Sequence, residues 1–224
     1  MPPKPKYGRE EIAGVALQMI KEEGLAVLTA RDLGKRLGTS ASPIFTMFRN
    51  MDDVKQAARE LALVEFQEYI SDYKKYTPAF KRIGMRMVSY AIHQPNVFKL
   101  LFMQEHAEEY DFSNTIKDLG ESADVCKELI MHDYGMTQEQ ADLMFEQMWV
   151  YTYGLGVLCA TRVCHFSEEE IGKRLGVMFA SLAMFIKSGN HGMIYGMPEK
   201  RTDGIYQDRD VGDIPYIMEE QTTL

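Results

Sequence analysis

The residues best suited to metal or acid–base chemistry are scattered along this chain. Histidine and cysteine side chains hold transition metals when they stand at close spacing, as in His-Glu-x-x-His or Cys-x-x-Cys. Neither pattern occurs here. The candidates are His93, His106, His132, His165, His191, Cys126, Cys159 and Cys164. The sequence therefore predicts no metal site, and the cysteines are expected to be free or buried thiols of a reducing cytoplasm.

Motifs that carry nucleophilic or phosphate chemistry are missing as well. The chain has no Gly-x-Ser-x-Gly elbow and no phosphate-binding loop. Gly154-Leu155-Gly156 is too short for a dinucleotide fingerprint and lies inside a predicted helix. The acids Glu168, Glu169 and Glu170 follow Ser167, which is typical of a helix start rather than of an acid–base site. We expect no enzymatic activity and no cofactor.

Charge is distributed unevenly along the chain. The net charge is -8, yet residues 1–60 hold ten Lys and Arg against eight Asp and Glu, a local balance of +2. A mildly basic first part on an acidic body suits a small nucleic-acid-binding module whose body stays away from phosphates. The Pro- and Lys-rich start does not resemble a secretory signal, and no apolar run is long enough for a membrane helix.

Nearly every segment has the apolar spacing of an amphipathic helix, so the predicted fold class is all-α. Helices are predicted at 10–23, 30–37, 43–48, 54–75, 79–93, 97–104, 114–132, 138–163 and 168–187. The stretch 106–112 is predicted as a loop, and the tail from about 189 as irregular structure. We expect two domains, a three-helix DNA-binding domain over 1–52 and a helical ligand-binding and dimerisation domain over 53–224.

Residues 29–48 predict two short helices that meet at Gly38. Leu33 and Leu37 on the first helix can face Ile44 and Phe48 on the second and close a small core with the helix before them. A sharp reversal favours glycine because it requires a positive φ. A second helix of this size fits the major groove, although an ordinary helical hairpin has the same pattern.

The stretch 10–59 resembles the N-terminal domain of the TetR family of bacterial transcriptional regulators. The resemblance is carried by Ala13-x-x-x-Leu17, Glu23-Gly24-Leu25, Leu28-Thr29-x-Arg31-x-Leu33, Leu37-Gly38-Thr39-Ser40, Ile44-Phe45-x-x-Phe48 and Asn50-Met51-Asp52-Asp53-Val54. It covers about 50 residues. The rest of the chain matches the family only in helix number and length.

The resemblance implies which residues contact DNA. They are Arg31, Ser40, Ala41, Ser42, Pro43, Phe45, Thr46, Met47, Arg49 and Lys55. The flexible cations Lys4, Lys6 and Arg9 could meet the phosphate backbone together with Lys55.

The second of the two short helices departs from the family pattern. The family often has Lys, Thr and Tyr or His where this chain has Ala41, Pro43, Phe45 and Met47, and Met51 stands where a Lys often follows. We therefore expect polar base recognition mainly from Arg31, Ser42 and Thr46, with Ala41, Pro43 and Met47 contacting thymine methyl groups. Phe48 is expected in the core, while Phe45 fits either place.

The last two long helices are predicted to form a dimer interface, because two half-sites need two copies of the module. Both helices have a wide apolar face and several glycines that permit close approach. The expected interface residues are Leu155, Leu158, Leu175, Met178, Phe179, Leu182 and Phe185. These faces could equally be core within one chain, and the resemblance favours a four-helix dimer seam.

Methionine and aromatic residues in the middle of the chain predict an apolar ligand pocket. Its expected lining is Met87, Tyr90, Phe98, Phe102, His106, Met148, Trp149 and Tyr151. His106 or His93 could anchor a polar group of the ligand. A methionine-rich core without a pocket is the alternative.

Together these patterns predict a cytoplasmic, homodimeric regulator that represses transcription at a palindromic double-stranded DNA operator. A small, mostly apolar effector would release it by favouring a conformation with the wrong spacing of the two DNA-binding modules. No membrane partner is expected. The alternative is a helical protein-interaction module without DNA binding.

Overall fold

The computed structural model describes residues 7–105, 112–119 and 121–188, and every regular element within them is helical. The predicted all-α fold class is confirmed. None of the helices in this part of the chain is both long enough and apolar enough to cross a lipid bilayer. The predicted irregular tail, Lys4, Lys6 and His106 lie outside the described residues.

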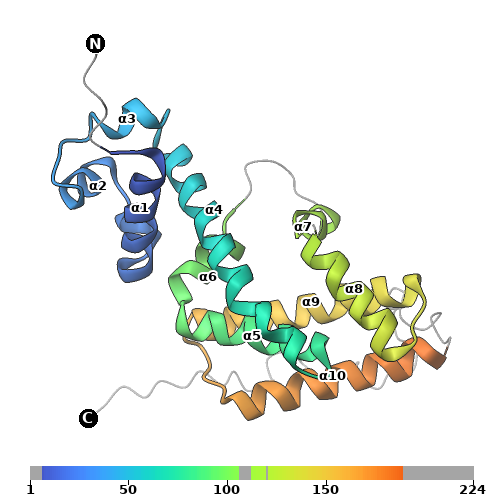
Figure 1. The fold of residues 1–224 in the computed structure, drawn as a ribbon. Coiled ribbons are helices and arrows are strands. Elements are labelled where there is room, and N and C mark those ends of the chain that lie inside the picture. The colour runs from blue at the N-terminus through green and yellow to red at the C-terminus, as the bar shows by residue number, and fades with distance from the viewer. Residues whose placement is uncertain (1–6, 106–111, 120, 189–224) are drawn as a thin grey trace, which may run out of the picture. The chain divides into compact units, whose positions relative to one another are not determined.

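Figure 1 shows the helical elements in their order along the chain. They are α1 (Arg9–Glu23), the 3-10 turn η1 (Leu25–Val27), α2 (Ala30–Arg36), α3 (Ile44–Met47), α4 (Met51–Ile70), the 3-10 turn η2 (Ser71–Lys75), α5 (Ala79–His93), α6 (Pro95–Phe102), α7 (Phe112–Asp118), α8 (Glu121–Tyr134), α9 (Gln138–Ala160) and α10 (Glu168–Ser188).

Several predicted boundaries differ from the observed ones. The predicted helix 114–132 is divided into α7 and α8, and Gly120, a poor helix former, falls between them. The predicted helix 54–75 is α-helical only to Ile70 and continues as the 3-10 turn η2. The predicted helix 138–163 ends at Ala160, where Thr161 caps α9.

Side-chain caps explain where the helices begin. Thr29, Asn50, Thr137 and Ser167 each accept a hydrogen bond from the backbone amide three residues further on. Each bond satisfies one of the amides that a helix start leaves without a partner. The starts of α2, α4, α9 and α10 are therefore encoded locally.

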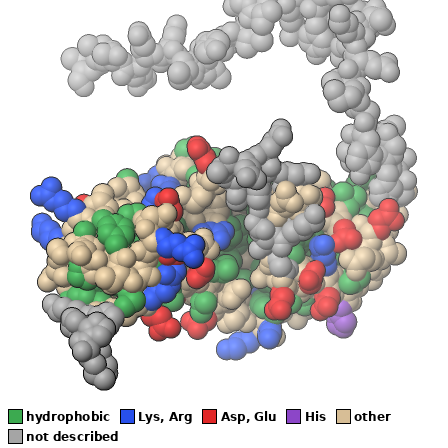
Figure 2. Space-filling view, turned by 90° about the horizontal axis from the view of Figure 1, so that it is seen from above, with side chains coloured by type: hydrophobic (Ala, Val, Ile, Leu, Met, Phe, Trp, Pro, Cys, Tyr) green, Lys and Arg blue, Asp and Glu red, His purple; other side chains and the backbone are tan. Residues whose placement is uncertain are grey.

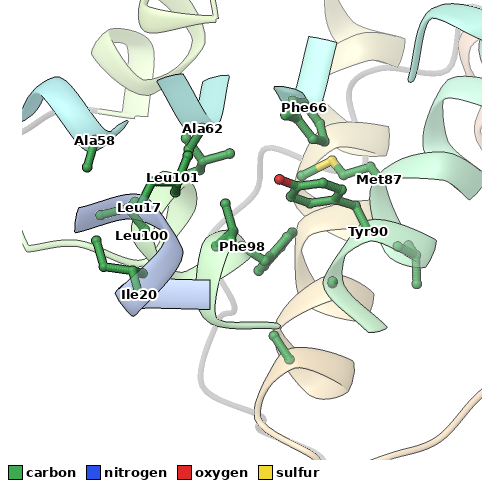
Figure 3. Packing of buried hydrophobic residues seen from close by; sticks show 14 of the residues in the cluster. Leu17, Ile20, Ala58, Ala62, Phe66, Met87, Tyr90, Phe98, Leu100 and Leu101 are labelled. Carbon is green, nitrogen blue, oxygen red and sulfur yellow. The ribbon is translucent and has the colours of Figure 1, made fainter. Parts of the chain in front are cut away.

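The first helices pack through α1 onto α4 and α6. Leu17 and Ile20 of α1 gather with Ala62 of α4 and with Leu100 and Leu101 of α6 (Figure 3). The small side chain of Ala62 is fully buried, and it allows α1 and α4 to approach closely. One apolar core therefore continues from the α1–α3 group into the rest of the chain.

Polar contacts reinforce the same packing. The Asn96 side chain of α6 donates a hydrogen bond to the Lys21 carbonyl at the end of α1 (3.1 Å), and Arg59 of α4 donates one to the Leu101 carbonyl (3.2 Å). Lys21 also pairs with Glu65 at 2.7 Å. No linker stands at the predicted domain boundary near residue 52, because α4 runs through that point without a break.

The body, α5 to α10, is built around α5 and α9, with α8 and α10 packed against both (Figure 1). Phe98 of α6 is fully buried and fills the space over Gly156 of α9. A Cβ atom at Gly156 would lie 2.6 Å from the Phe98 ring, which is closer than real contacts allow. Because Gly156 has no side chain, α6 can lie this close to α9.

Among the described residues, the Tyr90 hydroxyl is the one side-chain oxygen that is wholly shut off from solvent and has no hydrogen-bond partner. Its ring packs edge-on against Phe66 and Tyr69, at 5.1 Å between centroids in each case. Burial raises the pKa of its hydroxyl to about 12, so the group stays neutral. A buried hydroxyl without a partner destabilises the fold.

The Tyr90→Phe substitution should therefore stabilise the protein by about 1 kcal/mol, since it removes the oxygen and keeps the ring. Tyr153→Phe is the matched control, because the Tyr153 hydroxyl donates to the Phe102 carbonyl at 3.1 Å and its loss should destabilise by about 1 kcal/mol. Urea denaturation of both variants measures the two changes. A loss of stability in Tyr90→Phe would contradict this account.

Candidate nucleic-acid interface

The reversal after α2 is fixed by hydrogen bonds that require a glycine. The Gly38 amide donates to the Lys35 carbonyl (3.1 Å), and the Thr39 amide donates to the Gly34 carbonyl (2.9 Å). This pair of bonds is the Schellman motif, in which the residue after the C-cap takes a positive φ. Gly38 has a φ of +66°. The predicted need for glycine at this position is confirmed.

A second glycine, which the sequence reasoning missed, brings the turn against α2. A Cβ atom at Gly34 would lie 3.0 Å from the Ser40 carbonyl carbon and 3.1 Å from the Ala41 amide nitrogen. Both neighbours are backbone atoms, so they cannot move aside as a flexible side chain does. The signal available in the sequence was a glycine inside a short helix, where it otherwise costs stability.

The turn after Gly38 leads into α3, which is only four residues long. The Ile44 amide donates to the Ala41 carbonyl (3.1 Å), and Thr46 Oγ1 donates to the Pro43 carbonyl (2.6 Å). Residues 41–43 form a turn, so the helix predicted over 43–48 is α-helical only from Ile44 to Met47. Pro43 precedes the helix as its N-cap residue.

The two sides of α3 differ sharply in burial. Ile44 is fully buried and Phe48 is 2% exposed, and both belong to the common core. Phe45 is 46% exposed, and Thr46 and Arg49 are exposed as well. The expectation of Phe48 in the core is confirmed, and Phe45 lies on the outer side.

The end of α3 is tied to the start of α4 through Asp53. Arg9 Nη2 pairs with Asp53 Oδ1 at 2.6 Å, and Arg9 Nη1 donates to the Met47 carbonyl at 3.0 Å. The Arg49 backbone amide donates to Asp53 Oδ2 at 3.1 Å. The hydrogen bonds from Arg9 and from the Arg49 amide hold the pKa of Asp53 below its usual value. Arg9, expected to contact phosphate, is therefore engaged within the chain and stacks over the Phe48 ring at 4.2 Å.

The remaining cations fall into two groups. Arg36 pairs with Glu22, and Lys55 pairs with Asp52 at 3.0 Å. Among the described residues, neither the Arg31 nor the Lys35 side chain has a hydrogen-bond or ion-pair partner, and both side chains are exposed. They stand four residues apart on α2 and so share one side of the helix. Lys35 was not among the predicted DNA-contacting residues.

The other predicted contact residues lie close to these. Ser40 and Ser42 are exposed, whereas Ala41, Pro43 and Met47 are half-buried. Figure 2 shows Lys and Arg side chains over the end of the molecule formed by α1–α3. The structure thus brings together a surface made of the outer sides of α2 and α3 and the turn between them, and we call it the α2–α3 surface.

A cavity of about 360 Å³ lies in the body between α4, α5, α8 and α9. Four of the predicted pocket residues line it, namely Met87, Phe102, Met148 and Trp149. His106 lies outside the described residues, and the other three do not line the cavity: Tyr90 packs behind Phe66, Phe98 is buried against Gly156, and Tyr151 lies half-buried elsewhere on α9. His93, the other suggested polar anchor, is exposed and bonds to Ser89.

Sequence reasoning missed the walls that α4 and α8 supply. They include Phe66, Ile70, Ala123, Val125 and Cys126. Burial raises the pKa of the Cys126 thiol to about 12, so it stays protonated. The apolar spacing of Ala123, Cys126 and Ile130 on α8 was the signal that could have found this wall.

The predicted dimer residues of α9 and α10 differ in burial. Leu155 and Leu175 are buried within the chain, and Phe179 packs against Tyr134 at 4.4 Å between ring centroids. Leu158, Met178, Leu182 and Phe185 are half-buried. The exposed apolar side chains of these helices are Val150 (50% exposed), Val177 (68%) and Met184 (77%). The dimer interface stays a prediction, and its half-buried residues stand on the same helices as these exposed apolar side chains.

Within the described ranges, no three His, Cys, Asp or Glu side chains come together as a metal site would require. No protein-family model matches the chain, and no curated protein matches it in sequence.

Gly34→Ala should destabilise the protein by about 1–3 kcal/mol, because the new methyl group would meet backbone atoms that must shift. Gly14→Ala is the matched control: Gly14 is exposed within α1 and a Cβ there meets nothing within 4 Å. That change should stabilise by about 0.5–1 kcal/mol, as expected for glycine to alanine in a helix. Urea denaturation compares them, and a Gly34→Ala variant as stable as Gly14→Ala would refute the close approach.

Proposed function

We propose that the chain is a DNA-binding transcriptional regulator of the TetR type, which presents the α2–α3 surface to the major groove. The observation that carries the proposal is the contrast across this helix pair. Leu33, Ile44 and Phe48 anchor its inner side in the core, while Arg31, Lys35 and Thr46 project from the outer side. The resemblance of residues 10–59 to the family's DNA-binding domain supports the same reading.

The chemistry of the α2–α3 surface suits a duplex. Arg31 and Lys35 are cations without a carboxylate partner among the described residues, so phosphate or a base edge can take that place without breaking an ion pair. Thr46 and Ser42 offer hydroxyl groups, and Ala41 and Met47 offer apolar contacts to thymine. The observed α3 is short, so the turn over residues 41–43 would contribute to the contacts as well.

A ligand in the body could control this surface through α6. Phe102 at one end of α6 lines the 360 Å³ cavity, and Asn96 at the other end bonds to the Lys21 carbonyl of α1. A ligand that moves Phe102 would shift the equilibrium between positions of the α1–α3 group by its difference in affinity for them. Repression released by a small, mostly apolar effector is the regulatory scheme that we propose.

A helical protein-interaction module is the second candidate, and the exposed ring of Phe45 is the observation that favours it. Phosphate contacts weaken steeply with salt, whereas an apolar protein contact does not. The salt dependence of binding therefore separates the two candidates.

The DNA-binding proposal predicts that the full chain enriches a palindromic motif from a random duplex library at low salt. On the enriched duplex, Arg31→Ala should weaken binding by about 1–3 kcal/mol and leave the circular dichroism spectrum unchanged. Arg36→Ala on the same helix is the control, since Arg36 is already paired with Glu22 and should matter less. Failure to enrich any duplex would remove the proposal.

The dimer proposal places the outer sides of α9 and α10 against those of a second copy. Val177→Glu would bury a carboxylate in that seam and should raise the dimer dissociation constant roughly tenfold or more, equivalent to about 1.4 kcal/mol. Val163→Glu is the control, because Val163 is equally exposed (70%) but lies after the end of α9. Sedimentation equilibrium measures both, and an unchanged dimer in Val177→Glu would place the interface elsewhere.

A further inference from the structure

A second cavity lies directly behind the first. It measures about 220 Å³ and is enclosed by α5, α8, α9 and α10, with Tyr134 and Phe179 among its walls. The two cavities have the side chains of Phe80, Met148 and Thr152 in common, together with Gly84. These residues therefore border both cavities. Together the cavities fall within the range of about 300–1,000 Å³ that is typical of small-molecule sites.

The partition between the cavities is thin and carries one polar group. Gly84 has no side chain, and a Cβ there would lie 3.2 Å from Leu175 Cδ1 and 3.7 Å from Thr152 Oγ1. Thr152 is buried, at 5% exposed, and its hydroxyl bonds to no described residue. Met148 is a flexible side chain that can change rotamer. A chain-like ligand could therefore pass from one cavity to the other beside a hydroxyl group.

A cation without a counter-ion stands at the second cavity. Lys81 of α5 is half-buried and lies across α10, where its Nζ is 3.5 Å from the position of a Cβ on Gly176. No described carboxylate pairs with it. An ammonium group with no carboxylate partner gains from an anion placed beside it.

The opposite end of the cavity pair differs in charge. Lys74 lines the mouth of the larger cavity, but Glu121 lines it too, so the two charges offset each other there. An anionic group is therefore better accommodated beside Lys81 than beside Lys74.

We propose that the effector is an elongated amphiphilic anion, with a carboxylate at Lys81 and an apolar chain that passes Thr152 into the larger cavity beside Met87 and Trp149. The proposal deepens the proposed function, since it assigns the chemical class of the effector. It can be tested without DNA, because Trp149 is the single tryptophan of the chain and lines the larger cavity.

The test titrates the full chain with decanoate and with decanol, and follows tryptophan fluorescence. The two probes have the same chain length and differ in charge. The measured quantity is the ratio of their dissociation constants in each protein, in which the shared apolar contribution cancels. We expect saturable decanoate binding, and we expect Lys81→Met to reduce the preference for decanoate by roughly fivefold to tenfold.

Three further proteins complete the experiment. Lys81→Arg keeps the charge and should retain the preference. Lys173→Met is the matched control, because Lys173 lies on the exposed side of α10, paired with Glu169 at 2.8 Å. Lys74→Met tests the orientation, and loss of the preference in this variant rather than in Lys81→Met would overturn the assignment.

Wild-type protein supplies an independent measurement should Lys81→Met fold poorly. Decanoate affinity should fall as salt is raised, whereas decanol affinity should not. Absence of saturable decanoate binding, or an equal salt response for both probes, would overturn the proposal. If the chain binds decanoate but enriches no duplex, the ligand class stands and the DNA-binding function is removed. If it enriches a duplex but does not bind decanoate, the DNA-binding function stands and the ligand class is removed.

Discussion

The burial of the apolar residues of α6 is the constraint on which the rest of this structure depends. Val97, Phe98, Leu100 and Leu101 are all buried, although the helix has only eight residues. A helix so apolar must be covered by neighbours on more than one side. Here α1 and α4 cover one side, and α9 covers another, where Gly156 makes room for Phe98. The α1–α3 group is consequently packed on the body through a shared core rather than attached by a flexible segment.

This packing positions the residues of both proposed sites. The α2–α3 surface can present side chains to a duplex only because Ile44 and Phe48 hold its inner side in place and because Arg9 and Asp53 join α3 to α4. The cavity pair lies on the other side of α6, bounded by α5 and α9. A ligand there would act on the α1–α3 group through Phe102 and Asn96, which are two turns apart on one short helix. In the proposed regulator, effector binding and DNA binding are thus linked through the contacts of α6 with the cavity and with α1.

The sequence predicted best where a signal is local. Ser167 precedes a helix as expected, and Thr29, Asn50 and Thr137 cap helices in the same way, because a capping side chain bonds to an amide only three residues away. Gly38 was identified for the same reason, since its positive φ belongs to a motif that closes within six residues. Gly34 was missed because its role depends on the backbone of Ser40 and Ala41, which only the folded turn brings near. The cavity walls on α4 and α8 were missed for an equivalent reason, since no spacing along one helix reveals which other helix it will face.

By itself the sequence determined the all-α class, the order of the helices and which residues are apolar. Periodicity and capping depend on residues close together in the sequence, so they can be recognised before the fold is known. Tertiary structure decided which apolar side chains face inward and which remain outside: Leu155 and Leu175 are core, whereas Val177 and Met184 are exposed. It also decided that Arg9 is paired while Arg31 and Lys35 are not engaged by any described residue. Such outcomes depend on partners tens of residues away, and a helix carries no information about its partner until the two pack together.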